Sequence, residues 1–288
     1  MQSARQPLSA RSQARSRALA QSAIDDYGWF TPADLRKLFQ VIHDIGADRV
    51  ILVGGQSLTA WVQYFDIQLP AIDGRFLTAD ADFQGTKADA EAIANALGGK
   101  IQYARMDDHT PEVAVVEYQG AEGPILHIDF LTGILGVPPE DVAEFSLALA
   151  LPGHAAINVI HPTLVLESRC SNLERLPQKR NGNGITQAKV GCQIVQRYLE
   201  LQIADPERHR ACHNNARRLL QLAQSKAGLY VWKNYGIDVL SPINPEQMPG
   251  EFLKSWPHDL ARVERKREIA NRQHAVAQGA RGGRQEGE

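Results

Sequence analysis

The chain has 288 residues, of which 43% are hydrophobic and 22% are charged, so it is long enough for one large or two modest domains with a substantial core. No stretch approaches the ~20 consecutive apolar residues that a membrane-spanning helix requires, so no membrane association is expected. The net charge of −2 is unevenly distributed: residues 1–150 carry 11 Lys and Arg against 20 Asp and Glu, and residues 151–288 carry 20 against 13. This asymmetry indicates either a polyanionic partner or two domains with unequal surfaces.

The N-terminal residues 1–30 are expected to form a flexible basic arm. Residues 1–23 are rich in arginine and contain no acid, but they lack the apolar core of a secretory signal, which leaves a transit peptide as the alternative. Three cysteines without CxxC spacing favour a reducing compartment over a disulfide framework. We therefore expect a cytoplasmic protein.

Residues 31–160 alternate between helical and strand patterns. A capping box formed by Thr31 and Asp34, with Pro32 in the first turn, predicts a helix that Gly46 ends. The remaining pattern predicts a short buried strand with a glycine turn (49–55), a helix from about residue 56, a strand (74–85), a helix (87–99), a hairpin (112–133) and a strand (155–160). This order predicts a mixed β-sheet with helices packed on it.

From His161 onward the pattern becomes helical. Apolar residues recur at helical spacing over residues 162–176, 186–203, 206–225 and 249–278. Pro257 must kink the last of these helices or mark its start. We predict an α/β (α+β) fold with a sheet domain of residues 31–160, an all-helical domain of residues 161–277 and a disordered tail of residues 278–288.

Two aspartates lie two positions apart in the strand predicted over residues 74–85. Side chains at positions i and i+2 of a strand share a face, so Asp80 and Asp82 point the same way. Ala81 and Phe83 then point into the core. Two carboxylates this close repel each other, and a divalent cation relieves the repulsion. Mg²⁺ favours carboxylate oxygens together with substrate phosphates, so this pair predicts a magnesium site.

A third aspartate lies in the second strand of the predicted hairpin. The alternate apolar residues of the segment ILHIDF face the core, so His127 and Asp129 face the other way. If this strand lies beside the strand of the paired aspartates, Asp129 becomes the third carboxylate of one metal cluster. His127 shares that face, where it either contacts substrate or metal or has a structural role.

The glycine turn at the end of the first strand predicts a phosphate site. Gly54 and Gly55 allow the backbone to approach a ligand closely, and a helix follows at once. The free N–H groups and dipole of a helix N-terminus favour a phosphate, and the Ser57 hydroxyl is an additional donor. A phosphate site that faces a carboxylate–metal cluster is typical of phosphoryl or nucleotidyl transfer.

Three segments, VGGQSLTAW, TADADF and HIDF, together resemble the glycine–serine motif, the paired aspartates and the third aspartate of the DNA polymerase β-like nucleotidyltransferases. The chain resembles most the AbiEii-type nucleotidyltransferase toxins, which pair such a domain with a helical one. The resemblance covers residues 31–175. It implies that the chain transfers a nucleoside monophosphate from a nucleoside triphosphate with two Mg²⁺ ions.

The resemblance also implies residue roles. Asp80 and Asp82 would bind both metal ions, and Asp129 would bind the catalytic ion and help to activate the acceptor hydroxyl. The triphosphate would be held by Gly54, Gly55 and Ser57.

Two departures from the family pattern concern the acceptor site and the phosphate site. Residues 66–76 are an insertion before the paired aspartates, where a loop could shape the acceptor site. The helix after the sheet domain lacks the lysine that AbiEii-type proteins carry. The first lysine after the start of that helix is Lys179, beyond its end. Arg169 is the nearest cation, and its guanidinium can grip phosphate, so we assign it to nucleotide binding.

Alternative functions and acceptors remain open on the sequence alone. A catalytically silent fold could bind a partner, such as an antitoxin-like protein, although such a module has no need of three converging acids. A DxD glycosyltransferase would leave Asp129 and the glycine turn without a role. The acceptor can be RNA, including tRNA, or protein, and the basic clusters of the C-terminal half favour RNA.

Overall fold

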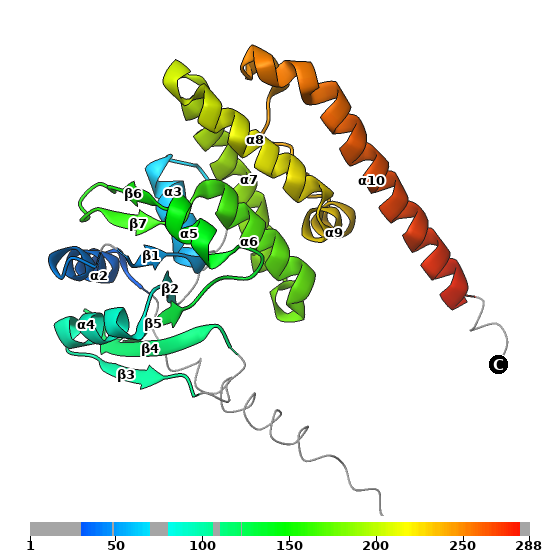
Figure 1. The fold of residues 1–288 in the computed structure, drawn as a ribbon. Helices are drawn as coiled ribbons and strands as arrows, with labels where there is room; N and C mark the ends of the chain where they lie inside the picture. The colour runs from blue at the N-terminus through cyan, green and yellow to red at the C-terminus, as the bar shows by residue number, and fades with distance from the viewer. Residues whose placement is uncertain (1–29, 48, 70–79, 106–109, 122, 283–288) are drawn as a thin grey trace, which may run out of the picture.

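The computed structural model describes residues 30–47, 49–69, 80–105, 110–121 and 123–282 (Figure 1). The basic arm expected over residues 1–30, apart from Phe30, lies outside this part of the chain, as do most of the 66–76 insertion and the last six residues of the expected tail. Within the described residues, a mixed seven-stranded sheet is followed by a helical region, so the predicted fold class is confirmed.

The sheet combines neighbouring and distant segments of the chain. Its strands are β1 (Ile51–Leu52), β2 (Ala81–Gln84), β3 (Lys100–Tyr103), β4 (Glu112–Gln119), β5 (Ile125–Leu131), β6 (Leu147–Leu149) and β7 (Ile157–Val159). They lie in the order β3-β4-β5-β2-β1-β7-β6. The predicted hairpin is present as the antiparallel pair β4 and β5. β2 and β5 are parallel neighbours, as are β1 and β7. This order places the strand of the paired aspartates directly beside the strand of the third.

Helices flank the sheet and then continue as a separate layer (Figure 1). They are α2 (Pro32–Asp44), α3 (Gly54–Tyr64), α4 (Lys87–Leu97), α5 (Pro139–Phe145), α6 (Pro162–Arg175), α7 (Gly182–Ile203), α8 (His209–Gln224), α9 (Lys226–Tyr235) and α10 (Gly250–Gly282), with a short 3₁₀ turn, η1, at Pro177–Lys179. No helix in this described part of the chain combines the length and apolar character that crossing a membrane requires.

The helix ends follow the local sequence. The predicted capping box is present, since the Thr31 side chain accepts from the backbone N–H of Asp34 and the Asp34 side chain accepts from the N–H of Thr31. α3 begins at Gly54, two residues earlier than expected. α7 begins at Gly182 because the Asn181 side chain caps it, so part of the segment expected to be a polar loop is helical.

Four helices and strands of the described residues were not predicted, namely β3, β6, α5 and α9. β3 and β6 lie at the two edges of the sheet, where only one neighbouring strand buries them. Edge strands need little apolar alternation, and β6 has three residues, so neither leaves a clear pattern. α5 has seven residues, which is too short for a helical period to repeat.

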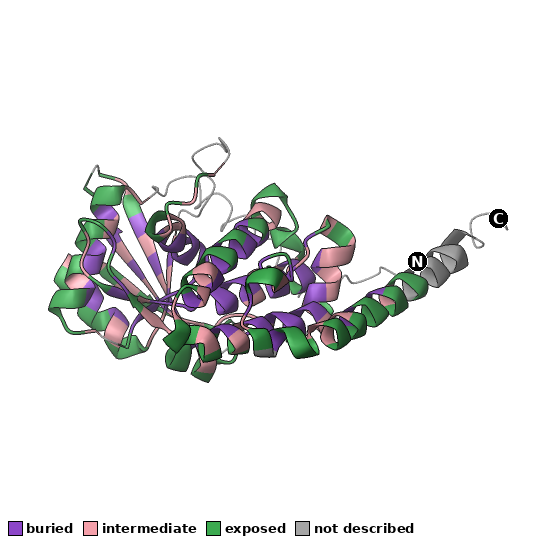
Figure 2. Cartoon of the chain, turned by 90° about the horizontal axis from the view of Figure 1, so that it is seen from above, coloured by how far each residue is buried: buried purple, intermediate pink, exposed green. Residues whose placement is uncertain are grey.

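Two apolar clusters form the core, and α6 and α7 contribute to both. The first cluster covers the sheet and α2 to α4, and it includes Leu164 of α6 and Ile194 of α7. The second lies among α6 to α10 and includes Leu166 and Val195. These two helices therefore join the sheet to the helical region. Figure 2 shows buried residues both in the sheet and among the helices. α10 contains Pro257; its first part packs against α8 and α9, and its C-terminal end extends away from them.

Candidate active site

Asp82 and Asp129 lie side by side on neighbouring parallel strands. Their Cα positions are direct partners in the register of β2 and β5. Ala81 and Phe83 are buried on the opposite face of β2, as the two-residue period requires. Asp80 directly precedes β2, and its charge reaches both of the other carboxylates. The structure thus brings the three aspartates to one place on the sheet.

Burial raises the pKa of each of these aspartates, and repulsion by neighbouring carboxylates adds to the rise at Asp82 and Asp129. Burial is the largest cause for Asp129, and the charges of Asp82, Asp80 and Glu112 add to it, so that the pKa of Asp129 rises to about 8. Burial also raises the pKa of Asp82, against the opposing charge of Arg169. Without a cation beside it, Asp129 therefore resists ionisation at neutral pH.

The donor chemistry of this cluster fits a hard divalent cation. Three carboxylates that repel one another supply the oxygen ligands that Mg²⁺ prefers. Nevertheless, the described part of the chain contains no group of three His, Cys, Asp or Glu side chains already arranged to hold a metal ion. The residue types fit the ion, whereas their side chains are not gathered around one ion position.

The glycine turn at the start of α3 lies against the Asp82 carboxylate. Gly54 has a φ of 65°, and a Cβ added there would lie 1.7 Å from Oδ2 of Asp82. The backbone N–H of Gly55 donates a hydrogen bond to the same carboxylate. The backbone of β2 is tied to the turn as well, because Val53 N donates to Asp82 O at 2.8 Å. The first N–H groups of α3 and the carboxylates therefore share one site.

Ser57 is fully buried in the first turn of α3. Its hydroxyl donates to the carbonyl oxygen of Gly54 at 2.8 Å. In this conformation the proton of the hydroxyl stabilises the turn, so a phosphate contact by Ser57 requires the hydroxyl to rotate.

Arg169 extends from α6 toward Asp82. Burial lowers the pKa of Arg169, and the Asp82 carboxylate opposes that effect. Its Nη1 donates to Oε1 of Gln187 at 3.2 Å, while its Nε has no hydrogen-bond partner among the described residues. A cation with an unused donor thus lies next to the carboxylates, where the sequence indicated a nucleotide contact.

Lys179 also reaches the site, although the sequence pattern did not indicate it. Its ammonium lies close enough to Asp80 and Asp82 to oppose the rise in the pKa of both. Lys179 lies in η1, which follows α6, the helix in which the sequence has no lysine. The segment KRNGNG has the composition of a polar loop, so the sequence carried no signal for this placement of Lys179.

The turn of Lys179 is held in place by its neighbours. Arg180 Nε donates to the carbonyl of Leu173 at 2.9 Å, and its Nη2 donates to the carbonyl of Glu174 at 2.6 Å. The Arg180 guanidinium also lies 5.1 Å from the centre of the Tyr230 ring. A Cβ on Gly184 would lie 1.9 Å from the Lys179 carbonyl oxygen, so glycine is required there.

His127 lies near Asp80 on the face that the strand pattern predicts. Its Nε2 is 3.3 Å from Oε1 of Glu117 on β4. The charge of His127 opposes the rise in the pKa of Asp80. His127 is therefore placed to orient the carboxylates of this face.

Comparison with known proteins gives little further information. No protein-family model matches the chain, and no curated protein matches it. Among solved structures, the chain is similar to the antibiotic-resistance factor ANT(2'')-Ia, with 15% identity, 55% of this chain and 80% of that chain covered, and a TM-score of 0.37. It is also similar to JHP933 from Helicobacter pylori, with 12% identity, 88% and 100% covered, and a TM-score of 0.36. At these scores neither similarity identifies a family or an activity, so function must be argued from the site.

Proposed function

We propose that the chain is a Mg²⁺-dependent nucleotidyltransferase that moves a nucleoside monophosphate from a nucleoside triphosphate to an acceptor hydroxyl. The observation that carries the proposal is the register of β2 and β5, which pairs Asp82 with Asp129 directly against the glycine turn of α3. A carboxylate cluster beside a helix N-terminus supplies the two requirements of nucleotidyl transfer: ligands for a metal and donors for a phosphate.

The residues of the chain would divide these tasks. Asp80, Asp82 and Asp129 would hold Mg²⁺, which neutralises charge on the triphosphate when bound. The N–H groups at Gly54 and Gly55 would donate to phosphate oxygens, and for Gly55 the phosphate would replace the Asp82 carboxylate as acceptor. In the reaction, the acceptor oxygen bonds to the α-phosphorus while the bond to the β-phosphate oxygen breaks, and pyrophosphate leaves. The hydroxyl proton passes to a nearby carboxylate, the role assigned here to Asp129.

Positive charge beside the carboxylates supports the same assignment. Arg169 and Lys179 both act electrostatically on Asp82. A triphosphate carries more negative charge than Mg²⁺ offsets, and these two cations would stabilise its β- and γ-phosphates.

We propose RNA, such as tRNA, as the acceptor. The acidic site repels a polyanion, so an RNA acceptor needs cations elsewhere, and the C-terminal half carries the excess of Lys and Arg. A role in a toxin–antitoxin pair or in phage defence would follow from the AbiEii-type resemblance alone, and no contact in the described residues adds to it.

The test is transfer of label from each α-³²P-labelled nucleoside triphosphate in the presence of Mg²⁺ and cellular RNA. Wild type should label RNA, and Asp82→Asn should abolish labelling while the variant stays folded, because the removed charge is one of several that repel one another. Transfer at the wild-type rate by Asp82→Asn would refute the proposal. Nucleotide binding by the wild type without any transfer would favour the silent partner-binding module.

A further inference from the structure

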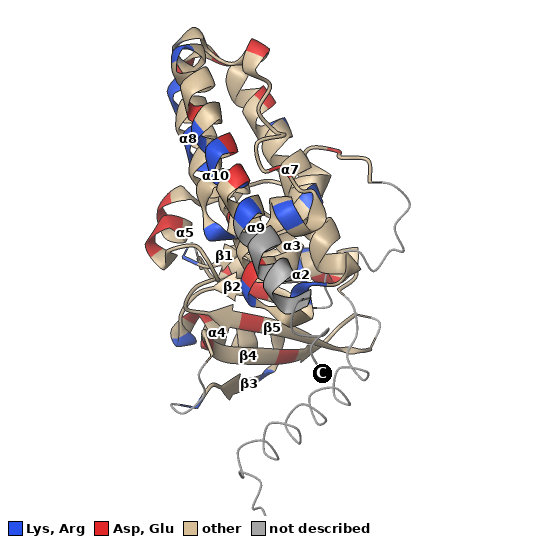
Figure 3. Cartoon of the chain, turned by 90° about the vertical axis from the view of Figure 1, so that its right-hand side faces the viewer, with Lys and Arg blue, Asp and Glu red and all other residues tan. Residues whose placement is uncertain are grey.

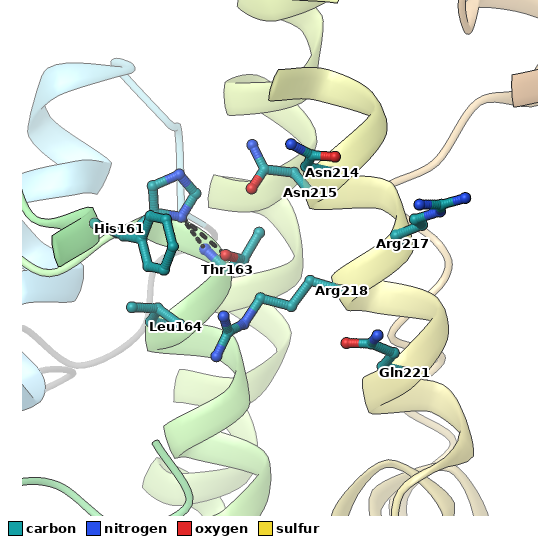
Figure 4. Close-up of a pocket in the computed structure, with 9 residues that line it drawn as sticks. His161, Thr163, Leu164, Asn214, Asn215, Arg217, Arg218 and Gln221 are labelled. Atoms are coloured by element: carbon teal, nitrogen blue, oxygen red, sulfur yellow. Dashed lines mark hydrogen bonds between the residues drawn. The ribbon is translucent and has the colours of Figure 1, made fainter. Parts of the chain in front are cut away.

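Three hollows open along one face of α8, and Arg217 lines all of them. One of ≈ 330 Å³ lies between α8, Phe145 and the first turn of α6 (Figure 4). Two others, of ≈ 660 Å³ and ≈ 680 Å³, lie between α8 and α10. Because they share Arg217, we treat them as one feature, the α8 groove, lined by Phe145, Arg210, Arg217, Gln221, Arg262 and Lys266.

The α8 groove is positively charged. Its lining includes Arg210, Arg217, Arg262 and Lys266, all exposed, and Asp259 is the acid among the described residues that line it. Neither Arg210 nor Arg217 forms an ion pair with another described residue. Basic residues follow α8 in Figure 3, above the sheet. These two guanidinium groups are therefore available to an anionic ligand.

Arg218, the neighbour of Arg217, has a different role. Its Nη2 lies 2.7 Å from Oδ2 of Asp141, and its Nε lies 2.9 Å from Oε2 of Glu167. It thus ties α8 to α5 and α6, and Figure 4 shows it leaving α8 in a different direction from Arg217. Arg218 therefore stabilises the fold, whereas Arg217 remains available to a ligand.

The uncharged lining favours RNA over an acidic protein. Phe145 is 42% exposed at one end of the groove, and an exposed ring beside arginines is a stacking surface for an unpaired base. The side-chain amides of Asn214 and Gln221 line the same hollow and can both donate to and accept from base edges. Stacking and amide contacts of this kind recognise single-stranded nucleic acid.

We propose that the α8 groove binds a single-stranded segment of an RNA acceptor. That this RNA is the acceptor rests on the proposed function. α6 separates the groove from the carboxylates: Glu167 of α6 contacts Arg218 of α8, whereas Arg169 of α6 extends toward Asp82. The groove is thus adjacent to the catalytic site and distinct from it, as a site that holds the acceptor away from the acidic cluster should be.

The test is fluorescence anisotropy with a short, labelled, single-stranded RNA of mixed sequence over a series of salt concentrations. The double variant Arg210→Ala, Arg217→Ala should weaken binding about tenfold at low salt. It should also lower the slope of log affinity against log salt concentration by the equivalent of about two phosphate contacts. Phe145→Ala should weaken binding about fivefold or more and leave the salt dependence unchanged, since stacking releases no counterions. Arg197→Ala is the matched control, because Arg197 is an exposed arginine of α7 outside the groove.

Two results would overturn the inference. One is equal affinity and equal salt dependence in wild type and in the Arg210, Arg217 double variant. The other is displacement of the RNA by poly-glutamate as readily as by unlabelled RNA, which would point to an acidic protein. Asp82→Asn should keep wild-type RNA affinity, so a failure of nucleotidyl transfer and a failure of the groove give different results.

Discussion

The ammonium of Lys179 approaches the carboxylates from a 3₁₀ turn, and two neighbours fix that turn. Arg180 binds the carbonyls at the end of α6, and Gly184 allows the backbone to pass the Lys179 carbonyl closely. The Lys179 side chain is exposed, so its ammonium group sits on a flexible stem attached to a fixed backbone. This arrangement suits a cation that meets the phosphates of an arriving nucleotide.

Lys179→Ala should therefore raise the KM for the nucleoside triphosphate about tenfold, because one charge-assisted phosphate contact is lost. Lys179→Arg should recover most of the loss, and Arg180→Ala should produce a smaller defect through the turn. Binding of a non-hydrolysable triphosphate and of the corresponding monophosphate gives the measurement. Lys189→Ala, which removes an exposed lysine of α7, is the control. Equal weakening of triphosphate and monophosphate binding would contradict a contact to the terminal phosphates.

The sequence predicted the faces of the aspartates and not the position of Lys179, for a physical reason. A two-residue period decides which way Asp80, Asp82 and Asp129 point, so the pattern alone orders them relative to the core. The position of Lys179 depends on Arg180 reaching back to α6, a tertiary contact without any periodicity. The hydrogen bond from the Ser57 hydroxyl to Gly54 was equally unpredictable, because it forms only when α3 begins at the glycine.

At the scale of elements, the first turn of α3 is shaped by Gly54. Its positive φ is costly for other residues, and the Asp82 carboxylate fills the space where a Cβ would lie. Gly98, at the end of α4, has almost the same φ, 66°, and a Cβ there would meet nothing within 4 Å. Substitution of Gly98 therefore tests backbone strain alone, whereas substitution of Gly54 tests backbone strain together with the close contact to Asp82.

Gly54→Ala should destabilise the protein by more than Gly98→Ala, for which about 1 kcal/mol is expected from backbone strain alone. Only Gly54→Ala should also abolish nucleotidyl transfer, because its methyl group displaces Asp82. Chemical denaturation and the transfer assay on both variants provide the check. Equal loss of stability with full activity in Gly54→Ala would show that the turn does not need to contact the carboxylate.

For the whole molecule, the order of elements in the sheet region was predictable except for the short pieces, whereas the way its two regions join was not. A composition change at residue 161 suggested two domains, yet α6 and α7 contribute apolar side chains to both core clusters. Helical periodicity identifies the apolar face of a helix but not its neighbours. For this reason the position of Arg169, beside Asp82 on an adjoining helix, required the fold.

Folding stability of the whole protein should depend on pH through the carboxylate cluster. The pKa of Asp129 is about 8 in the folded state, well above the ~3.9 of an unfolded aspartate. Between these values the folded protein keeps a proton that the unfolded chain has released, so stability must fall as pH rises toward 8. The buried His161 acts in the opposite sense at lower pH, because burial reduces its pKa to about 4.

From pH 7 to 8.5 an unfolded histidine is largely neutral, so the carboxylates and the three buried cysteines, whose thiol pKa burial raises, decide the pH dependence. In EDTA, the Tm of the wild type should fall across this interval, by an amount equivalent to roughly 1 kcal/mol, which allows for the partial exposure of the cluster. Asp129→Asn should reduce the pH dependence, because its side chain cannot ionise, and the part that remains comes from the buried cysteines. Mg²⁺ should raise the Tm of the wild type more at pH 8.5 than at pH 7, since the ion binds the ionised carboxylates in place of the proton. A parallel pH dependence in wild type and Asp129→Asn would show that Asp129 is not the proton-binding group.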